Sequence, residues 1–183
     1  MIVYGMKVSY MVGSSAAFFS GINIMMPMVG AFAGLATSCA VLGLNFLVFG
    51  LFAVNPLHYL AYHIPGLFAS AYWAREHWSI RLAVPVICMA LFVVHPVGRY
   101  ALPYALYWLI PVALYFARQT TVTKALGSTM TAHAVGSVIW IYTVPMTAAQ
   151  WYTLITVVAV ERLLFAAAMV VTYTVGVWAV AQV

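Results

Sequence analysis

Charged residues are scarce in this sequence. Seven of its 183 residues are Lys or Arg, two are Glu, and none is Asp. The charged share is 5%, whereas about 25% is typical of a soluble domain. Because so few charges cannot cover the surface of a water-soluble globule, the composition excludes a soluble enzyme, a nucleic-acid-binding domain, a coiled coil and a disordered chain.

Carboxylates and cysteines are also too few for several reactions that occur in membranes. Glu161 is the one carboxylate inside an apolar run, so the carboxylate clusters that hold metal ions in phosphoryl-transfer and CDP-alcohol enzymes are missing. The sequence has no HExxH motif and no aspartate for an intramembrane protease. Cys39 and Cys88 form no CxxC pair, which excludes a thiol oxidoreductase, and we expect no metal site.

Hydrophobic residues make up 67% of the chain, and its mean hydropathy is +1.07. We therefore expect residues 1–183 to form a single integral membrane domain, all-α, built as a polytopic bundle of transmembrane helices in the lipid bilayer. The basic residues are dispersed at the ends of apolar runs, which is typical of orienting charges and not of nucleic-acid contacts. The plasma membrane is the expected location.

Seven apolar segments are candidate spans, since a spanning helix needs about 20 apolar residues. Residues 8–54 carry no charge and leave room for two spans, which separate near Asn23 and Pro27. The other segments are residues 56–74, 82–94, 100–117, 128–144 and 151–183. We prefer six spans, with either the first segment interfacial or residues 56–74 re-entrant, and seven spans is the alternative.

Basic residues orient the second half of the chain. Residues 75–81 and 118–124 are separated by one helical hairpin, so the positive-inside rule predicts that both loops are cytoplasmic. The loops near residues 55–56, 95–99 and 144–150 then lie outside. Arg99 is the single exception to the rule.

Small residues recur every four positions in the segment GAFAGLATS, at Gly30, Gly34 and Ser38. This spacing lets two helix backbones approach closely in lipid. The face serves either ordinary packing within the chain or docking of a partner membrane subunit.

Ionisable residues inside apolar segments are costly, which makes them candidates for a functional site. Glu161 and Arg162 follow the Pro145 turn at a depth of roughly 15 Å, and His133 lies at matching depth on the preceding segment. The spacing predicts a contact between His133 and Glu161 across this hairpin. The cluster is either a structural clamp or a proton-linked or ligand-binding site.

Five polar residues fall toward the predicted outer face: Asn55, His58, His63, His95 and Arg99. Each alone is explained as an interfacial residue, but their common side suggests a pocket. The excess of cations there favours an anionic or carboxylate-bearing ligand.

Aromatic residues line one face of the fifth apolar segment. Tyr100, Tyr104 and Trp108 recur every four residues, and Pro103 and Pro111 are expected to bend this helix. Because Tyr104 and Trp108 lie nearer the membrane centre than an interfacial belt requires, we include them in the predicted ligand-binding set.

Residues 27–75, with GAFAGLA followed by NPLHYLAYHIPGLFASAYWAR, resemble the S components of energy-coupling-factor vitamin transporters. The resemblance implies a small membrane protein, usually of six spans, that binds a vitamin or related nutrient near the outer face. It also implies docking of an energising module through small residues on helices.

We therefore expect small-molecule transport or substrate capture, with a pocket toward the outer face, rather than an enzyme. Two alternatives remain: an accessory structural subunit of a larger membrane complex, or a redox subunit that binds b-type haem or quinone. Haem needs two axial ligands, which His63 with His133, or His58 with His95, could supply. Apart from that haem alternative, no cofactor is expected.

Overall fold

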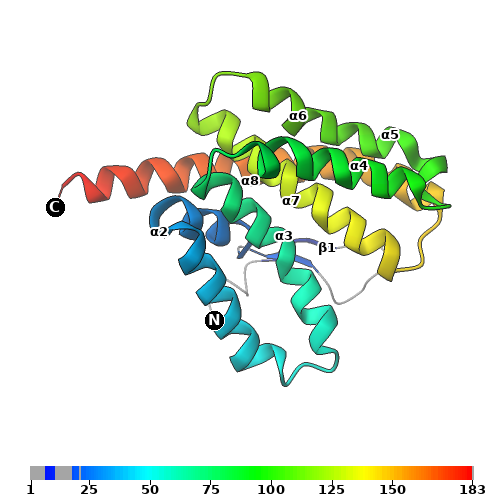
Figure 1. The fold of residues 1–183 in the computed structure, drawn as a ribbon, viewed down its shortest axis with the longest axis horizontal. Coiled ribbons are helices and arrows are strands. Elements are labelled where there is room, and N and C mark those ends of the chain that lie inside the picture. Colours follow the sequence, from blue (N-terminus) through cyan, green and yellow to red (C-terminus); the bar gives the residue numbers. More distant parts are fainter. Residues whose placement is uncertain (1–6, 11–17, 21, 183) are drawn as a thin grey trace.

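The computed structural model describes residues 7–10, 18–20 and 22–182, and almost all of these are helical. The elements run in the order β1 (Lys7–Tyr10), β2 (Phe18–Ser20), α2 (Ile22–Asn45), η1 (Phe46–Gly50), α3 (Pro56–Ala74), η2 (Ser79–Ala83), α4 (Val84–Val94), η3 (Gly98–Ala101), α5 (Leu102–Ala105), η4 (Leu106–Trp108), α6 (Leu109–Phe116), α7 (Thr121–Thr143) and α8 (Ala148–Val180). The helices form a bundle, with α2 and α3 on one side and α4 to α6 on the other (Figure 1).

Helix α7 is the centre of this bundle and packs against α3, α4, α6 and α8. Its sequence is rich in small and hydroxyl side chains, and these let neighbouring helices approach closely. A Cβ atom at Gly127 would lie 2.0 Å from the Tyr72 hydroxyl of α3. The buried Ser128 hydroxyl donates to the Ala69 carbonyl at 3.0 Å. The small side chains of α7 thus let its neighbours pack closely against it, and this close packing buries the helix.

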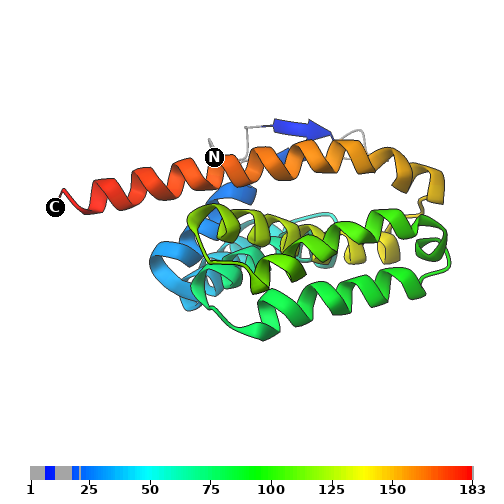
Figure 2. The ribbon, with the colours of Figure 1, turned by 90° about the horizontal axis from the view of Figure 1, so that it is seen from above.

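Helix α8 is the longest element, and its C-terminal end projects beyond the other helices (Figure 1). Its 33 residues correspond to roughly 50 Å, more than the roughly 30 Å of a bilayer core. Figure 2 shows it lying alongside the remaining helices as a separate layer, with the β1–β2 hairpin on its other side.

Helix α2 is bent at Gly34, where φ is 82° and ψ is 172°. The bend divides it into a first half that reaches α8 and a second half that runs antiparallel to α3. In the second half, the Tyr59 hydroxyl of α3 donates to the Asn45 side chain at 2.6 Å. In the first half, a Cβ atom at Gly176 of α8 would meet the Phe32 ring at 2.5 Å.

The first predicted span does not form a helix where the structure describes it. Residues 7–10 and 18–20 are antiparallel strands, and the intervening residues lie outside the described part of the chain. The 13 residues from 8 to 20 would reach only about 20 Å as a helix, too short for a bilayer core. A break near Asn23 is confirmed, since α2 begins at Ile22.

Two helices in the described part of the chain are long and apolar enough to cross a membrane. They are Asn23–Gly50 and Ala148–Val180, and a third span arises if the pair Ser79–Val94 and Gly98–Phe116, bent by 116°, counts as one. The chain is therefore a helical protein with two to three membrane-span candidates. The expected segment 56–74 coincides with α3, whose Asn55 N-cap accepts from the His58 backbone N–H.

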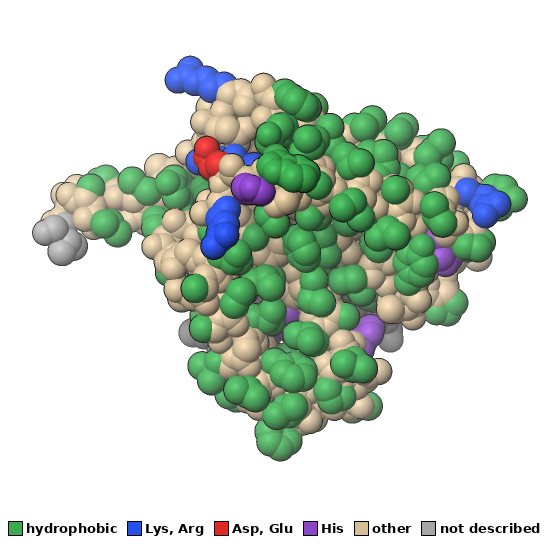
Figure 3. Space-filling model, viewed as in Figure 1, with side chains coloured by type: hydrophobic (Ala, Val, Ile, Leu, Met, Phe, Trp, Pro, Cys, Tyr) green, Lys and Arg blue, Asp and Glu red, His purple; other side chains and the backbone are tan. Residues whose placement is uncertain are grey.

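The predicted cytoplasmic loops meet at one end of the bundle. The buried Arg81 guanidinium donates to the Tyr72 carbonyl at 2.9 Å and to the Gln119 side chain at 2.8 Å. Glu76 pairs with both Arg81 and Lys124, so it links the two loops. Figure 3 shows charged side chains near the ends of this face, with hydrophobic side chains between them.

Candidate ligand cavity

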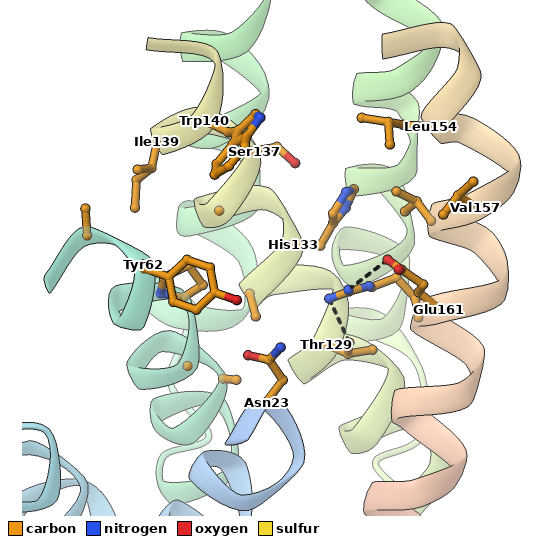
Figure 4. A pocket seen from close by; sticks show the side chains of 18 of the residues that line it. Asn23, Tyr62, Thr129, His133, Ser137, Ile139, Trp140, Leu154, Val157 and Glu161 are labelled. Carbon is orange, nitrogen blue, oxygen red and sulfur yellow. Dashed lines mark hydrogen bonds and ion pairs between the residues drawn. The ribbon is translucent and has the colours of Figure 1, made fainter. Parts of the chain in front are cut away.

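A cavity of about 130 Å³ lies between α3, α7 and α8. Asn23 at the start of α2 and Tyr104 of α5 complete its wall. Figure 4 shows Tyr62 of α3 on one side, His133 of α7 in the middle and Glu161 of α8 on the other side. The engineered cavity that binds benzene has about 150 Å³, so this one is suited to a ligand of roughly one ring.

Helical spacing explains how the polar lining is assembled. Thr129, His133 and Ser137 are four residues apart on α7, which places them on one face of that helix. On α8, Leu154, Val158 and Glu161 are likewise three or four residues apart and face the cavity. Two helices therefore present a polar and a mainly apolar stripe to the same space.

His133 is held by hydrogen bonds at both ring nitrogens. The Trp108 indole N–H donates to Nδ1 at 3.2 Å, and the Tyr104 hydroxyl lies 2.7 Å from Nε2. Because an indole can only donate, Nδ1 carries no proton and Nε2 carries it. Nε2–H therefore donates to the Tyr104 oxygen, and the Tyr104 hydroxyl donates to Ser137 Oγ at 3.1 Å. The chain of donors runs in one direction, from Trp108 to Ser137.

Glu161 and Arg162 form a buried ion pair within α8. Arg162 Nη2 lies 3.5 Å from Glu161 Oε2, and both residues are 4% exposed. Arg162 Nη1 also donates to the Thr129 hydroxyl of α7 at 3.4 Å (Figure 4). The guanidinium lies over the Phe165 ring, 4.8 Å from its centroid. The pair thus connects the two helices that form the cavity.

The predicted contact between His133 and Glu161 stays a prediction, and the structure shows other partners for both residues. Both residues line the same cavity. The ring nitrogens of His133, however, are engaged by Trp108 and Tyr104, and Arg162 accompanies the Glu161 carboxylate. Adjacent residues on a helix point about 100° apart, but the long Arg162 side chain bends back to the Glu161 carboxylate.

The residues of the predicted ligand-binding set divide between the cavity wall and positions outside it. His58 and Tyr104 line the cavity, and Trp108 lies behind His133. Asn55 caps α3, so its side chain is used by the backbone. His63 Nδ1–H donates to the Tyr59 carbonyl at 2.8 Å. Asn55 and His63 thus bond to backbone groups of α3, in agreement with the interpretation of each polar residue on its own.

His95 and Arg99 lie away from the cavity, in the turn that follows α4. His95 Nδ1 accepts the Val97 backbone N–H at 3.2 Å, and its ring meets Tyr142 edge-on with centroids 4.9 Å apart. Arg99 is exposed and is not part of the cavity wall. The predicted preference for an anionic ligand rested on Arg99 and the histidines together, and of these His58 lines the cavity whereas Arg99 and His95 do not.

The small-residue face packs within the chain, which agrees with the first of its two interpretations. A Cβ atom at Gly30 would lie 2.3 Å from the Ser70 carbonyl oxygen of α3. Ser38 is buried and its hydroxyl bonds the Ser70 hydroxyl. Gly34 supplies the backbone bend of α2. Close packing of α2 on α3 thus uses Gly30 and Ser38.

The residues present do not fit haem b. To ligate iron, His133 would give up its Trp108 hydrogen bond at Nδ1, or both hydrogen bonds if Nε2 is the ligand, and a cavity of about 130 Å³ is too small for a porphyrin. Among the described residues, no group of three or more His, Cys, Asp or Glu could hold a metal ion.

Several lining residues were not predicted from sequence: Asn23, Tyr62, Thr129, Ser137, Trp140 and Trp151. The four-residue spacing of Thr129, His133 and Ser137 was the available signal for two of them. No protein-family model, curated protein or solved structure matches the chain. The chemistry of the site therefore follows from its own geometry: aromatic walls, one ion pair and a few hydroxyl and N–H donors, the composition of a small-molecule site.

Proposed function

We propose that this chain is an integral membrane protein that captures a small molecule in the cavity between α3, α7 and α8 and serves its transport. The observation that carries the proposal is the cavity itself, with the Glu161–Arg162 pair in its wall. Ionisable residues within apolar helices are expensive, and they mark substrate or ion pathways in membrane proteins. Substrate capture of the S-component type agrees with such a site, although docking through Gly30 and Ser38 is not part of the proposal.

The proposal includes six transmembrane segments: α2, α3, α4 with η2, α5 with α6, α7 and α8. Their supporting observation is the alternation of the connecting loops. Loops 75–81 and 118–124 are linked through Arg81, Glu76 and Lys124, and the His95 and Tyr142 rings meet near the opposite ends of α4 and α7. We assign the end with loops 75–81 and 118–124 to the cytoplasm, because basic residues gather in these loops. The proposed location of the protein is the plasma membrane.

Ligand capture is tested by filling the cavity. Val157 is 40% exposed and lines the cavity, whereas Val160, one turn along α8, is 54% exposed and does not line it. The chain is purified in nanodiscs and small molecules that accompany it are identified by mass spectrometry. Val157→Phe is expected to abolish the accompanying molecule, whereas Val160→Phe retains it. If both variants keep the accompanying molecule, or if the wild type carries no specific compound, the accessory-subunit alternative is supported.

Topology is tested by labelling with an impermeant thiol reagent. Cys39 is exposed, so the background carries Cys39→Ser and Cys88→Ala. Single cysteines at Ser79 and Thr121 should stay unlabelled in intact cells and react after lysis. A cysteine at Thr147 should react in intact cells. Labelling of Ser79→Cys or Thr121→Cys from outside would overturn the orientation.

A further inference from the structure

Three donor protons in the cavity wall have no acceptor in the described part of the chain. Ser137 Oγ accepts a hydrogen bond from the Tyr104 hydroxyl, so the proton of the Ser137 hydroxyl has no acceptor. The Thr129 hydroxyl oxygen accepts a hydrogen bond from Arg162 Nη1 and makes no other hydrogen bond in the described chain, so its proton also has no acceptor. The Trp151 indole N–H is buried and has no partner there. The described cavity wall thus presents three donor protons that an occupant could satisfy.

Other hydroxyls of the chain show how such a proton can be satisfied, although the buried Thr131 hydroxyl, outside the cavity wall, also has no partner in the described chain. Thr37, Thr143 and Thr172 each donate to the carbonyl four residues earlier in their own helix, at 2.7–2.8 Å. Ser137 and Thr129 make no such bond. A buried donor that lacks an acceptor costs free energy, so these protons favour an occupant that supplies acceptors.

The charge of the wall selects among such occupants. Glu161 and Arg162 neutralise each other at 3.5 Å, and His133 is neutral because its Nδ1 accepts a hydrogen bond. A further anion or cation would therefore enter an apolar region without a free counter-charge, which is unfavourable. The rings of Tyr104 and Trp151, 4.8 Å between centroids, add an apolar surface beside Ser137.

We infer, on the basis of the proposed function, that the cavity binds a neutral single-ring compound through a carbonyl oxygen, with the Ser137 hydroxyl as its principal donor. The Trp108–His133–Tyr104 chain acts on the ligand through Ser137. By donating to Ser137 Oγ, Tyr104 turns the serine proton away from itself and toward the ligand. Tyr104 and His133 are therefore positioning residues, and Ser137 is the contact.

The test uses a pair of probes that match in shape and differ in one atom group. Acetophenone carries a carbonyl where α-methylstyrene carries a C=CH₂ group. Binding to the protein in nanodiscs is measured by equilibrium dialysis, with empty nanodiscs subtracted. Acetophenone is expected to bind about tenfold more tightly than α-methylstyrene, the contribution of one satisfied hydrogen bond. Ser137→Ala should remove that preference by weakening acetophenone alone, and Ser137→Thr, which keeps a hydroxyl, should restore it.

Tyr104→Phe separates positioning from contact. It leaves the Ser137 hydroxyl in place but frees it to rotate, so the preference for acetophenone should fall severalfold without being lost. An exposed control, Tyr100→Phe, should leave the ratio unchanged.

The failures of the two proposals are distinguishable. Equal binding of acetophenone and α-methylstyrene would refute the carbonyl inference and leave small-molecule capture intact. Tighter binding of benzoate or 1-phenylethylamine would refute the neutral ligand. A preference that survives Ser137→Ala would refute the role of that hydroxyl. If no probe binds above empty nanodiscs and no compound accompanies the purified protein, the proposed function itself is wrong.

Discussion

At the scale of single residues, the chemistry of one donor orders the whole site. Trp108 can only donate, so it sets the tautomer of His133 and, through it, the direction of the Tyr104 hydroxyl. Every polar member of this chain is buried, at 3% for Tyr104 and 7% for His133. Buried networks of this kind are stabilising only while each member keeps its partner.

Tyr104→Phe is expected to destabilise the protein by about 1–3 kcal/mol. The substitution removes the acceptor of His133 Nε2–H and the donor to Ser137 without changing the size of the ring. The free energy of unfolding is measured by titration with sodium dodecyl sulfate in mixed micelles. Tyr100→Phe, at a position 69% exposed, serves as control and should change it little. Equal effects at the two positions would contradict the network.

Arg162→Met is expected to cost about 3–5 kcal/mol, because it leaves the buried Glu161 carboxylate without its cation. Adding Glu161→Gln removes the orphaned charge, so the double variant should recover more than half of the loss. The same unfolding titration gives the coupling energy from a double-mutant cycle. Additive effects of the two substitutions would show that the pair is not coupled.

At the scale of elements, α2 shows how one residue changes the course of a helix. Gly34 has a φ of 82°, a conformation that side-chain-bearing residues adopt at a cost. The bend lets the first half of α2 reach α8 while the second half packs along α3. Asn23 then comes to line the cavity.

Gly34→Ala is expected to destabilise the protein by about 1–3 kcal/mol through backbone strain, because a φ of 82° with a ψ of 172° lies in a region that essentially only glycine adopts. Gly43 of the same helix is the matched control, because its φ is not positive and, as at Gly34, no atom lies within 4 Å of an added Cβ. Gly43→Ala should be neutral or stabilising by up to about 1 kcal/mol. Thermal unfolding in detergent measures both variants, and equal shifts in the midpoint would show that the bend carries no strain.

At the scale of the whole molecule, polar contacts between loops hold the charged end of the bundle. Arg81 reaches from η2 to the Tyr72 carbonyl of α3 and to Gln119 in the loop before α7. Glu76 adds ion pairs to Arg81 and Lys124. Three chain segments are thereby joined outside the apolar core.

Stability should fall in acid through Glu76. The Lys124 hydrogen bond, followed by the charges of Lys124 and Arg81, holds the pKa of Glu76 below its ordinary value of 4.5. A lowered carboxyl pKa contributes stability that is present above the unfolded pKa and is lost as the pH falls through the folded pKa. The wild type should therefore be more stable than Glu76→Gln at pH 7, and the difference should shrink below about pH 4. Unfolding midpoints across pH 3–7 measure this difference, and a difference independent of pH would refute the linkage.

The parts of the fold that could be predicted are those set by residues close together in the sequence. The limits of α3 follow from Asn55 and Pro56, an N-cap and a helix-starting proline, and from the polar residues after Ala74. Likewise, the meeting of loops 75–81 and 118–124 follows from one intervening hairpin. Such features depend on neighbours in the sequence, so local patterns contain them.

The sequence by itself determined the apolar helices and the places of His133, Glu161 and Arg162 along two of them, because hydropathy and helix rise act along the chain. Only the tertiary structure decided the partners of these residues. Trp108 and Tyr104 reach His133 from 25 and 29 positions away, and Thr129 meets Arg162 from 33. Which way a side chain turns among several buried partners depends on how the helices rotate against one another. That rotation is set by the packing of α7 among its neighbours, which no single segment specifies.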